Sequence, residues 1–129
     1  MIGRVLAPAT LAVLIALSVA CGSSGEGGRE VRITQGQDEC TPKTIEATPG
    51  EKLNLIVTND SDKEPYELEG EGGTKLEEII VPEGKTREVG FDVPEEAGSY
   101  ELKCYVPGDI ETIIEVQVNV SGATEDTGY

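Results

Sequence analysis

Apolar and polar residues alternate at a two-residue spacing along most of this chain, and this period constrains its fold more than any other feature. The clearest stretch is residues 114–120, which read IEVQVNV, and residues 53–57, 89–93 and 100–104 repeat the scheme. Successive side chains of a strand point to opposite faces, so such a segment buries one face and exposes the other. No stretch after residue 20 keeps a 3.6-residue period. The chain is therefore predicted to be all-β.

Short turn sequences separate the alternating segments, at residues 48–51, 81–84 and 106–109. In the last of them, Val-Pro-Gly-Asp, Pro and Gly stand where a type II turn requires them. Strands are expected near residues 31–34, 44–48, 52–59, 66–69, 77–81, 86–93, 99–104 and 112–120. Seven or eight short strands at this spacing predict a Greek-key β-sandwich. Its expected core includes Leu55, Val57, Phe91, Tyr100, Leu102, Val116 and Val118.

The first 20 residues have the composition of an export signal. Arg4 precedes an apolar run, and Ala20 supplies the small residue that a cleavage site requires. The stretch LSVAC, which ends at Cys21, resembles a bacterial lipobox. The resemblance implies that Cys21 is lipidated and holds the protein on the extracytoplasmic face of a bacterial membrane. The alternative is an ordinary signal peptide followed by a coincidental cysteine.

Composition divides the remainder of the chain into three parts. Residues 21–29 are rich in Gly and Ser and are expected to form a flexible tether. Residues 30–120 carry the alternating segments and are expected to form one domain, which we predict to be a monomer. Residues 121–129 have no apolar periodicity and are expected to form a flexible tail.

The balance of charges and the absence of histidine exclude several classes of function. The chain has 10 Lys and Arg against 25 Asp and Glu, for a net charge of −15, and it contains no His. Such a surface repels nucleic acid and attracts cations, so no nucleic-acid partner is expected. Without His, the chain cannot build Ser-His-Asp or Cys-His catalytic machinery or a His-ligated zinc site. We predict that the protein is not an enzyme.

Two thiols, Cys40 and Cys104, remain in the domain if Cys21 is lipidated. In an exported protein such a pair favours a disulfide, which would stabilise the fold by about 2–4 kcal/mol. The alternative is a metal site, because Cys104 continues an inward-facing series at the end of a strand and the loop after it carries Asp109. A third alternative is two unlinked, inert thiols.

Segments from both halves of the domain resemble the cupredoxin family in sequence and in order. They are residues 50–53 (GEKL), 57–60 (VTND) and 98–109 (GSYELKCYVPGD). The resemblance covers residues 30–120 and implies a cupredoxin-like sandwich. Electron-transfer cupredoxins bind copper through two His, one Cys and a weak axial Met, of which only the Cys is present, as Cys104. Asp109 stands where the second His would fall, so a blue-copper site is rejected.

Within that superfamily, the chain resembles the cupredoxin domain of the Efe-type periplasmic iron-uptake proteins. The matching motifs are Cys40-Thr41-Pro42, Tyr66-Glu67, Leu76-Glu77-Glu78 and the segment from Gly98 to Cys104. The resemblance implies a copper or iron site at one end of the sandwich, made by the two cysteines and nearby carboxylates. The candidate ligands carried over to this chain are Cys40, Cys104, Asp109, Glu67, Glu77 and Glu78.

Two functions follow from these alternatives. In the first, the protein is a membrane-anchored lipoprotein that binds copper or iron and works with a metal transporter. In the second, a Cys40–Cys104 disulfide staples a structural or protein-interaction domain that holds no metal. In both, the cupredoxin resemblance implies that the two sulfurs meet at one end of the sandwich, with Asp109 and at least one of the three glutamates beside them.

Overall fold

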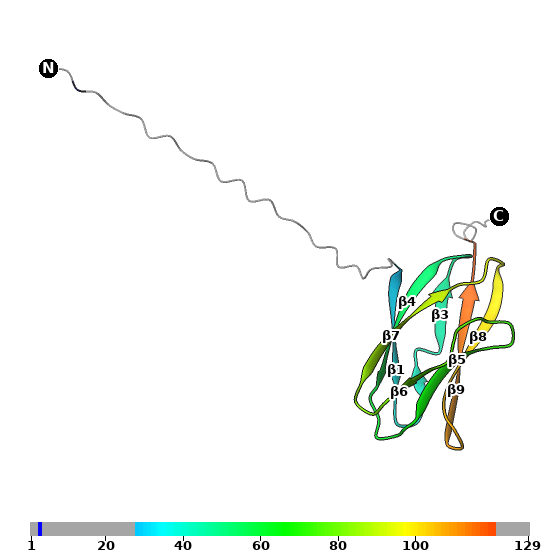
Figure 1. Ribbon diagram of the computed structural model, residues 1–129. Coiled ribbons are helices and arrows are strands. Elements are labelled where there is room, and N and C mark those ends of the chain that lie inside the picture. Colours follow the sequence, from blue (N-terminus) through cyan, green and yellow to red (C-terminus); the bar gives the residue numbers. More distant parts are fainter. Residues whose placement is uncertain (1–2, 4–27, 121–129) are drawn as a thin grey trace, which may run out of the picture.

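A computed structural model describes residue 3 and residues 28–120, and within these residues every regular element is a strand (Figure 1). The strands are β1 (Arg29–Gln35), β2 (Cys40–Thr41), β3 (Thr44–Ala47), β4 (Lys52–Asn59), β5 (Tyr66–Glu71), β6 (Ile79–Val81), β7 (Thr86–Asp92), β8 (Gly98–Val106) and β9 (Ile110–Val118). The all-β prediction is confirmed.

The strands form two sheets that pack face to face. The four-stranded sheet has the order β2-β1-β4-β7, and the five-stranded sheet has the order β3-β9-β8-β5-β6. The pairs β1–β4 and β3–β9 are parallel, and all other pairs are antiparallel. The described part has nine strands rather than the expected seven or eight. The additional one, β2, has only two residues, and alternation cannot be read from so short a segment.

The inward faces of the two sheets supply the core. Six of the seven expected core residues are buried, whereas Tyr100 is only partly buried and packs against the edge of the core. The Tyr100 hydroxyl donates to the carbonyl oxygen of Glu96 at 2.8 Å, so its polar end is directed to a nearby turn. Tyr66, at the start of β5, is completely buried in the core, and its hydroxyl donates to the Gly36 carbonyl at 2.8 Å.

The turns expected at residues 48–51 and 106–109 form where the sequence places them. In the first, the Glu51 amide donates to the Thr48 carbonyl at 3.1 Å. In the turn between β8 and β9, the Asp109 amide donates to the Val106 carbonyl at 2.9 Å. Gly108 has φ 77°, the left-handed conformation that a type II turn requires at its third position. The turn expected at residues 81–84 lies one residue later, because its hydrogen bond runs from the Lys85 amide to the Pro82 carbonyl.

The lower end of the sandwich in Figure 1 is where the loops that bear on function meet. β1 and β4 finish there, β5 begins there, and the turn between β8 and β9 lies at the same end. Four connections therefore meet at this end: residues 36–39, 60–65, 82–85 and 107–109.

The predicted lipidation site Cys21, the tail at residues 121–129 and nearly all of the predicted signal peptide lie outside the described residues. Of the expected tether, Arg29 is the first residue of β1 and forms an ion pair with Glu51 at 2.8 Å. No helix long and apolar enough to cross a membrane is found among the described residues.

Candidate functional site

A disulfide bond joins Cys40 and Cys104 at the loop-covered end of the sandwich. Cys40 lies on β2 of the four-stranded sheet and Cys104 on β8 of the five-stranded sheet, so the bond links the two layers. Their Cα atoms are 6.4 Å apart, and neither residue is exposed to solvent. The two sulfurs meet as the sequence predicted, in the bonded form.

Two polar side chains that the sequence analysis did not single out contact this pair. The Cys40 amide donates to Thr112 Oγ1 at 2.9 Å, and Gln35 Nε2 lies 3.8 Å from Cys104 Sγ. Gln35 is completely buried, and its Oε1 is the one buried side-chain oxygen or nitrogen of the described residues without a hydrogen-bond partner. A signal for it exists in the sequence, since Gln35 continues the inward-facing series Val31 and Ile33 with a polar residue.

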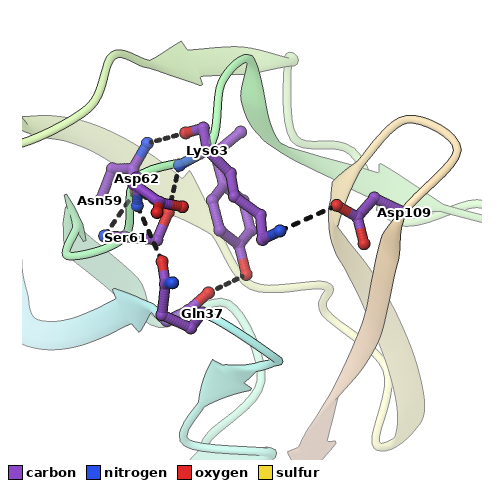
Figure 2. A network of polar contacts seen from close by, with 8 residues as sticks. Gln37, Asn59, Ser61, Asp62, Lys63 and Asp109 are labelled. Carbon is purple, nitrogen blue, oxygen red and sulfur yellow. Dashed lines mark hydrogen bonds and ion pairs between the residues drawn. The ribbon is translucent and has the colours of Figure 1, made fainter.

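Asn59 organises the loop of residues 60–63, which lies at the same end of the sandwich (Figure 2). Its Nδ2 donates to the carbonyl oxygens of Lys63 at 2.8 Å and Val81 at 3.0 Å. Its Oδ1 accepts from the amide and the hydroxyl of Ser61 at 3.0 and 2.7 Å. Because all of these groups are satisfied, the buried Asn59 fixes residues 60–63 in one conformation.

The same loop is joined to its two neighbours by side-chain contacts, which Figure 2 shows from close by. The Asp62 amide donates to Gln37 Oε1 at 2.8 Å. Lys63 Nζ reaches across to the turn between β8 and β9 and donates to Asp109 Oδ2 at 3.0 Å. This hydrogen bond raises the pKa of Lys63. Asp109 is therefore at the expected end of the sandwich, but at the surface and paired with a cation.

A cluster of carboxylates lies on the outer face of the five-stranded sheet. Glu67 and Glu69 of β5 and Glu78, just before β6, each offer an oxygen within 4.8 Å of the other two. The Tyr105 hydroxyl lies 2.8 Å from Glu67, 3.2 Å from Glu69 and 3.4 Å from Glu78. Its single hydrogen serves the nearest acceptor, Glu67. We call these four residues the outer acidic cluster.

The outer acidic cluster perturbs its own protonation. A hydrogen bond with Glu67 and the neighbouring charge raise the pKa of Glu78. Burial and the bonds to Glu67 and Glu69 raise the pKa of Tyr105, which keeps the phenol protonated at neutral pH. Tyr105 and Glu69 were not predicted as members of a site, because nothing in the sequence indicates that β5 and β8 pair in this register.

Strand geometry separates the outer acidic cluster from the disulfide. Leu68 pairs with Cys104 and Glu67 pairs with Tyr105 across β5 and β8. Since neighbouring residues of a strand face opposite ways, the first pair points into the core and the second points out. The expected gathering of Glu67 or Glu78 beside the sulfurs is therefore not what the structure contains. Glu77 is exposed and lies outside any strand.

The comparison with protein families uses nearly the whole chain. The model of the cupredoxin-like domain matches residues 8–116. The chain belongs to the cupredoxin-like family. No curated protein matches it.

Solved structures with the same fold include several copper proteins. Auracyanin A, a "blue" copper protein of Chloroflexus aurantiacus, is 19% identical over 72% of this chain and 100% of its own, with a TM-score of 0.57. The metal-binding domain of the Cu(I)-exporting P-type ATPase CopA of Streptococcus pneumoniae, solved with Cu(I), is 16% identical over 75% and 91% of the two chains, with a TM-score of 0.55. A copper-binding protein solved by NMR in the apo form is also 16% identical, over 75% and 93%, with a TM-score of 0.54. At these identities the likeness concerns the fold alone.

The side chains of this cupredoxin-like protein fit one form of copper and not another. A blue-copper site needs imidazole ligands, and the sequence contains no His. Two sulfurs brought together in a closed, largely apolar end of the sandwich are soft donors, which Cu(I) prefers. In the oxidised form described here both sulfurs are engaged with each other, so the fit applies to the reduced form.

Proposed function

We propose that this protein is a lipid-anchored, extracytoplasmic member of the cupredoxin-like family that binds one copper ion through Cys40 and Cys104 when both are reduced. The observation that carries the proposal is the meeting of two buried sulfurs, from different sheets, at one end of the sandwich. In the oxidised form the same sulfurs form a covalent staple. The redox state of the pair then decides whether the protein can hold copper.

The donor set supports copper over iron. Thiolates are soft ligands that favour Cu(I), whereas carboxylates suit harder ions. Binding requires both sulfurs as thiolates, so two protons leave as the ion enters. Oxidation removes both donors at once, because a disulfide sulfur carries no thiolate charge. The acidic surface of the chain attracts cations to the domain in either state.

The carboxylates carried over from the Efe-type resemblance are not ligands in this proposal. Asp109 is neutralised by Lys63, and Glu67 and Glu78 lie on the opposite face of the sheet from the sulfurs. The resemblance itself supports a role in metal handling or uptake, with a membrane transporter as the partner that receives or supplies the ion.

The test is a Cu(I) titration of reduced and oxidised protein against a chromophoric chelator. Full-length chains carrying Cys21→Ala should be compared, so that Cys40 and Cys104 are the only cysteines in the chain. One Cu(I) is expected per reduced chain and none per oxidised chain or per Cys40→Ser/Cys104→Ser chain. Asp109→Asn and Glu67→Gln are the matched controls and should retain the site. Equal binding by reduced and oxidised protein would overturn the proposal, and selective binding of Fe(II) would replace copper by iron.

A second function is favoured by the disulfide itself. If the reduced protein binds neither ion, the Cys40–Cys104 bond is a staple in a structural or protein-interaction domain. Such a domain would use its covalent link to hold the two sheets together outside the cell.

The anchor is tested separately, by the intact mass of the protein extracted from membranes. Two or three acyl chains on Cys21 are expected at the new N-terminus, since one chain binds a membrane only marginally. Cys21→Ala should leave the protein unprocessed or release it. A mature species that starts elsewhere or carries no acyl mass would contradict the lipobox interpretation.

A further inference from the structure

Gln35 is the one buried polar group beside the cysteine pair whose hydrogen bonding is incomplete. Its side chain is completely buried at the end of β1. Nε2 lies 3.8 Å from Cys104 Sγ, while Oε1 has no partner. Buried side-chain oxygens without a partner are rare in folded proteins, because the lost hydration is not replaced.

The register of β1 and β2 puts this amide next to the other sulfur as well. Gln35 and Cys40 are directly paired across the two strands. The side chains of directly paired residues lie on the same face, a few ångströms apart. The Gln35 side chain therefore lies on the same face as Cys40 and beside Cys104 Sγ, and Oε1 is the free acceptor of its amide.

A disulfide gives this acceptor nothing to bind. Neither sulfur of an S–S bond carries a hydrogen, so Oε1 has no donor among its sulfur neighbours. A thiol, by contrast, is a hydrogen-bond donor, although a weak one. Reduction creates two S–H groups at this place and therefore supplies the missing donor.

We propose that Gln35 shifts the thiol–disulfide equilibrium of Cys40 and Cys104 toward the dithiol, by leaving its Oε1 unsatisfied in the oxidised form and satisfied in the reduced form. Gln35 is a positioning residue in this role and not a ligand. The inference rests on the proposed function for its purpose, since the dithiol is the copper-binding form. The equilibrium itself involves no metal.

The step is a two-electron reduction by a dithiol. Two electrons and two protons pass to the disulfide, the S–S bond breaks, and each sulfur takes one proton. The reductant closes its own disulfide in exchange. Dithiothreitol in known ratios of its reduced and oxidised forms is the probe.

The experiment equilibrates metal-free, full-length Cys21→Ala protein with these mixtures, followed by acid quenching and thiol labelling under denaturing conditions. Gln35→Leu is expected to need a ratio of reduced to oxidised dithiothreitol about tenfold higher for half reduction, since no buried acceptor is then left without a partner. Gln35→Met, which preserves more of the side-chain volume, serves as the second variant if Gln35→Leu folds poorly. The same direction of shift is expected for it.

Thr112→Val is the matched control. Thr112 Oγ1 accepts from the Cys40 main-chain amide, a bond that does not depend on the state of the sulfurs. Its loss should destabilise both redox forms alike and leave the half-reduction ratio unchanged. Identical ratios for wild type and both Gln35 variants would overturn the inference. The redox equilibration contains no copper, so its result does not depend on the Cu(I) titration. A shifted half-reduction ratio in the Gln35 variants, together with no Cu(I) binding by the reduced wild type in that titration, would contradict the proposed function and leave the role of Gln35 intact.

Discussion

The disulfide end and the outer acidic cluster share two strands, β5 and β8, on which their residues are separated by a single step. Leu68 and Cys104 form one pair of the ladder, and Glu67 and Tyr105 form the next. The first pair is completely buried between the sheets, whereas Tyr105 on the outer face is partly exposed. One step of the strand period therefore separates the buried sulfurs from a carboxylate cluster in which Glu67 is buried and Glu78 is exposed.

This difference affects how each region contributes to stability. At the disulfide end, a covalent bond and buried hydrogen bonds lie away from solvent. Removing one partner there leaves a buried polar group unsatisfied, which lowers the free energy of unfolding substantially. On the outer face, Glu78 is exposed and Glu69 is half-buried, so solvent screens and hydrates these two carboxylates, whereas Glu67 is buried. Substitutions at the two regions should therefore differ in size even when the chemical change is similar.

The largest effect should come from removing the disulfide. Cys40→Ala/Cys104→Ala is expected to lower the free energy of unfolding by about 2–4 kcal/mol, because the unfolded chain regains the freedom that the cross-link removes. Urea unfolding with and without a reductant measures it. Reductant should destabilise the wild type and have no effect on the variant. An unchanged urea midpoint in the variant would mean that the pair adds nothing to the fold.

Asn59→Ala at the disulfide end should follow in size, with a loss of about 2 kcal/mol, because it leaves buried backbone groups without partners. Asn54→Ala is the matched control on the same strand. Asn54 donates to Glu88 at the exposed surface, so its loss should stay within about 0.5 kcal/mol. Equal losses at the two positions, measured by urea unfolding, would remove the distinction between the two environments.

On the outer face, Tyr105→Phe should lower the free energy of unfolding at pH 7 by about 1 kcal/mol. The variant loses the one hydroxyl that is shared among the three carboxylates. Thermal or urea unfolding at neutral pH measures the change. A more stable variant would mean that desolvating the Tyr105 hydroxyl costs more free energy than its hydrogen bonds to the carboxylates provide.

The pH dependence of stability should separate the outer acidic cluster from an ordinary ion pair. The pKa of Glu78 is raised above its usual value of 4.5, chiefly by its hydrogen bond with Glu67. The protonated Glu78 side chain therefore adds its full contribution to folding stability below pH 4.5, and this contribution is lost as the pH rises through the raised pKa. Glu78→Gln should thus be more stable than wild type at pH 7 and equal to it in acid. Urea unfolding from pH 3 to pH 7 tests this.

Glu51 should show the opposite sign in the same series. The hydrogen bond that Arg29 donates lowers the pKa of Glu51 below its usual value of 4.5. The ionised Glu51 side chain therefore contributes to folding stability above pH 4.5, and this contribution is lost as the pH falls through the lowered pKa. Glu51→Gln should be less stable than wild type at pH 7, and the difference should vanish in acid. Differences of the same sign for both variants would contradict these assignments.

The smallest effect is expected for Lys63→Gln. The ion pair with Asp109 lies at the surface, where such pairs contribute little, and the Lys63 carbonyl that binds Asn59 is kept in the variant. The midpoint of urea unfolding should move no more than the error of the measurement. A clear loss would mean that the Lys63–Asp109 contact between the two loops, and not Asn59 alone, holds this end in place.

Much of the fold could be predicted because it depends on local pattern. The alternation in residues 53–57 and 114–120 gave strands within a few residues of β4 and β9, and the Pro-Gly sequence at 107–108 gave the type II turn. β2 could not be predicted, since its two residues are held by pairing with β1 and not by any period. The lipobox prediction stays a prediction.

The candidate site could be predicted only in part, for the same reason. A pair of cysteines in a domain predicted to be exported made the Cys40–Cys104 bond a leading alternative. Which carboxylates stand near it depends on the register between β5 and β8, and a one-residue change in register moves every side chain to the other face. Glu67 and Glu78 consequently lie with Glu69 and Tyr105, and no sequence pattern predicts that these four residues are neighbours.

By itself, the sequence determined the all-β class, the exclusion of histidine chemistry, the acidic surface and the two sulfurs available to the domain. These properties follow from the composition and from the two-residue alternation of apolar and polar residues, and neither depends on which segments pack against each other. Only the tertiary structure decided that Gln35 lies beside Cys104 with a free acceptor and that Asp109 forms an ion pair with Lys63. It also decided that Glu67 and Glu78 lie on the opposite face of the sheet from the sulfurs. Those facts depend on strand pairing between distant segments, and the physical reason is that burial and hydrogen bonding are set by neighbours in space.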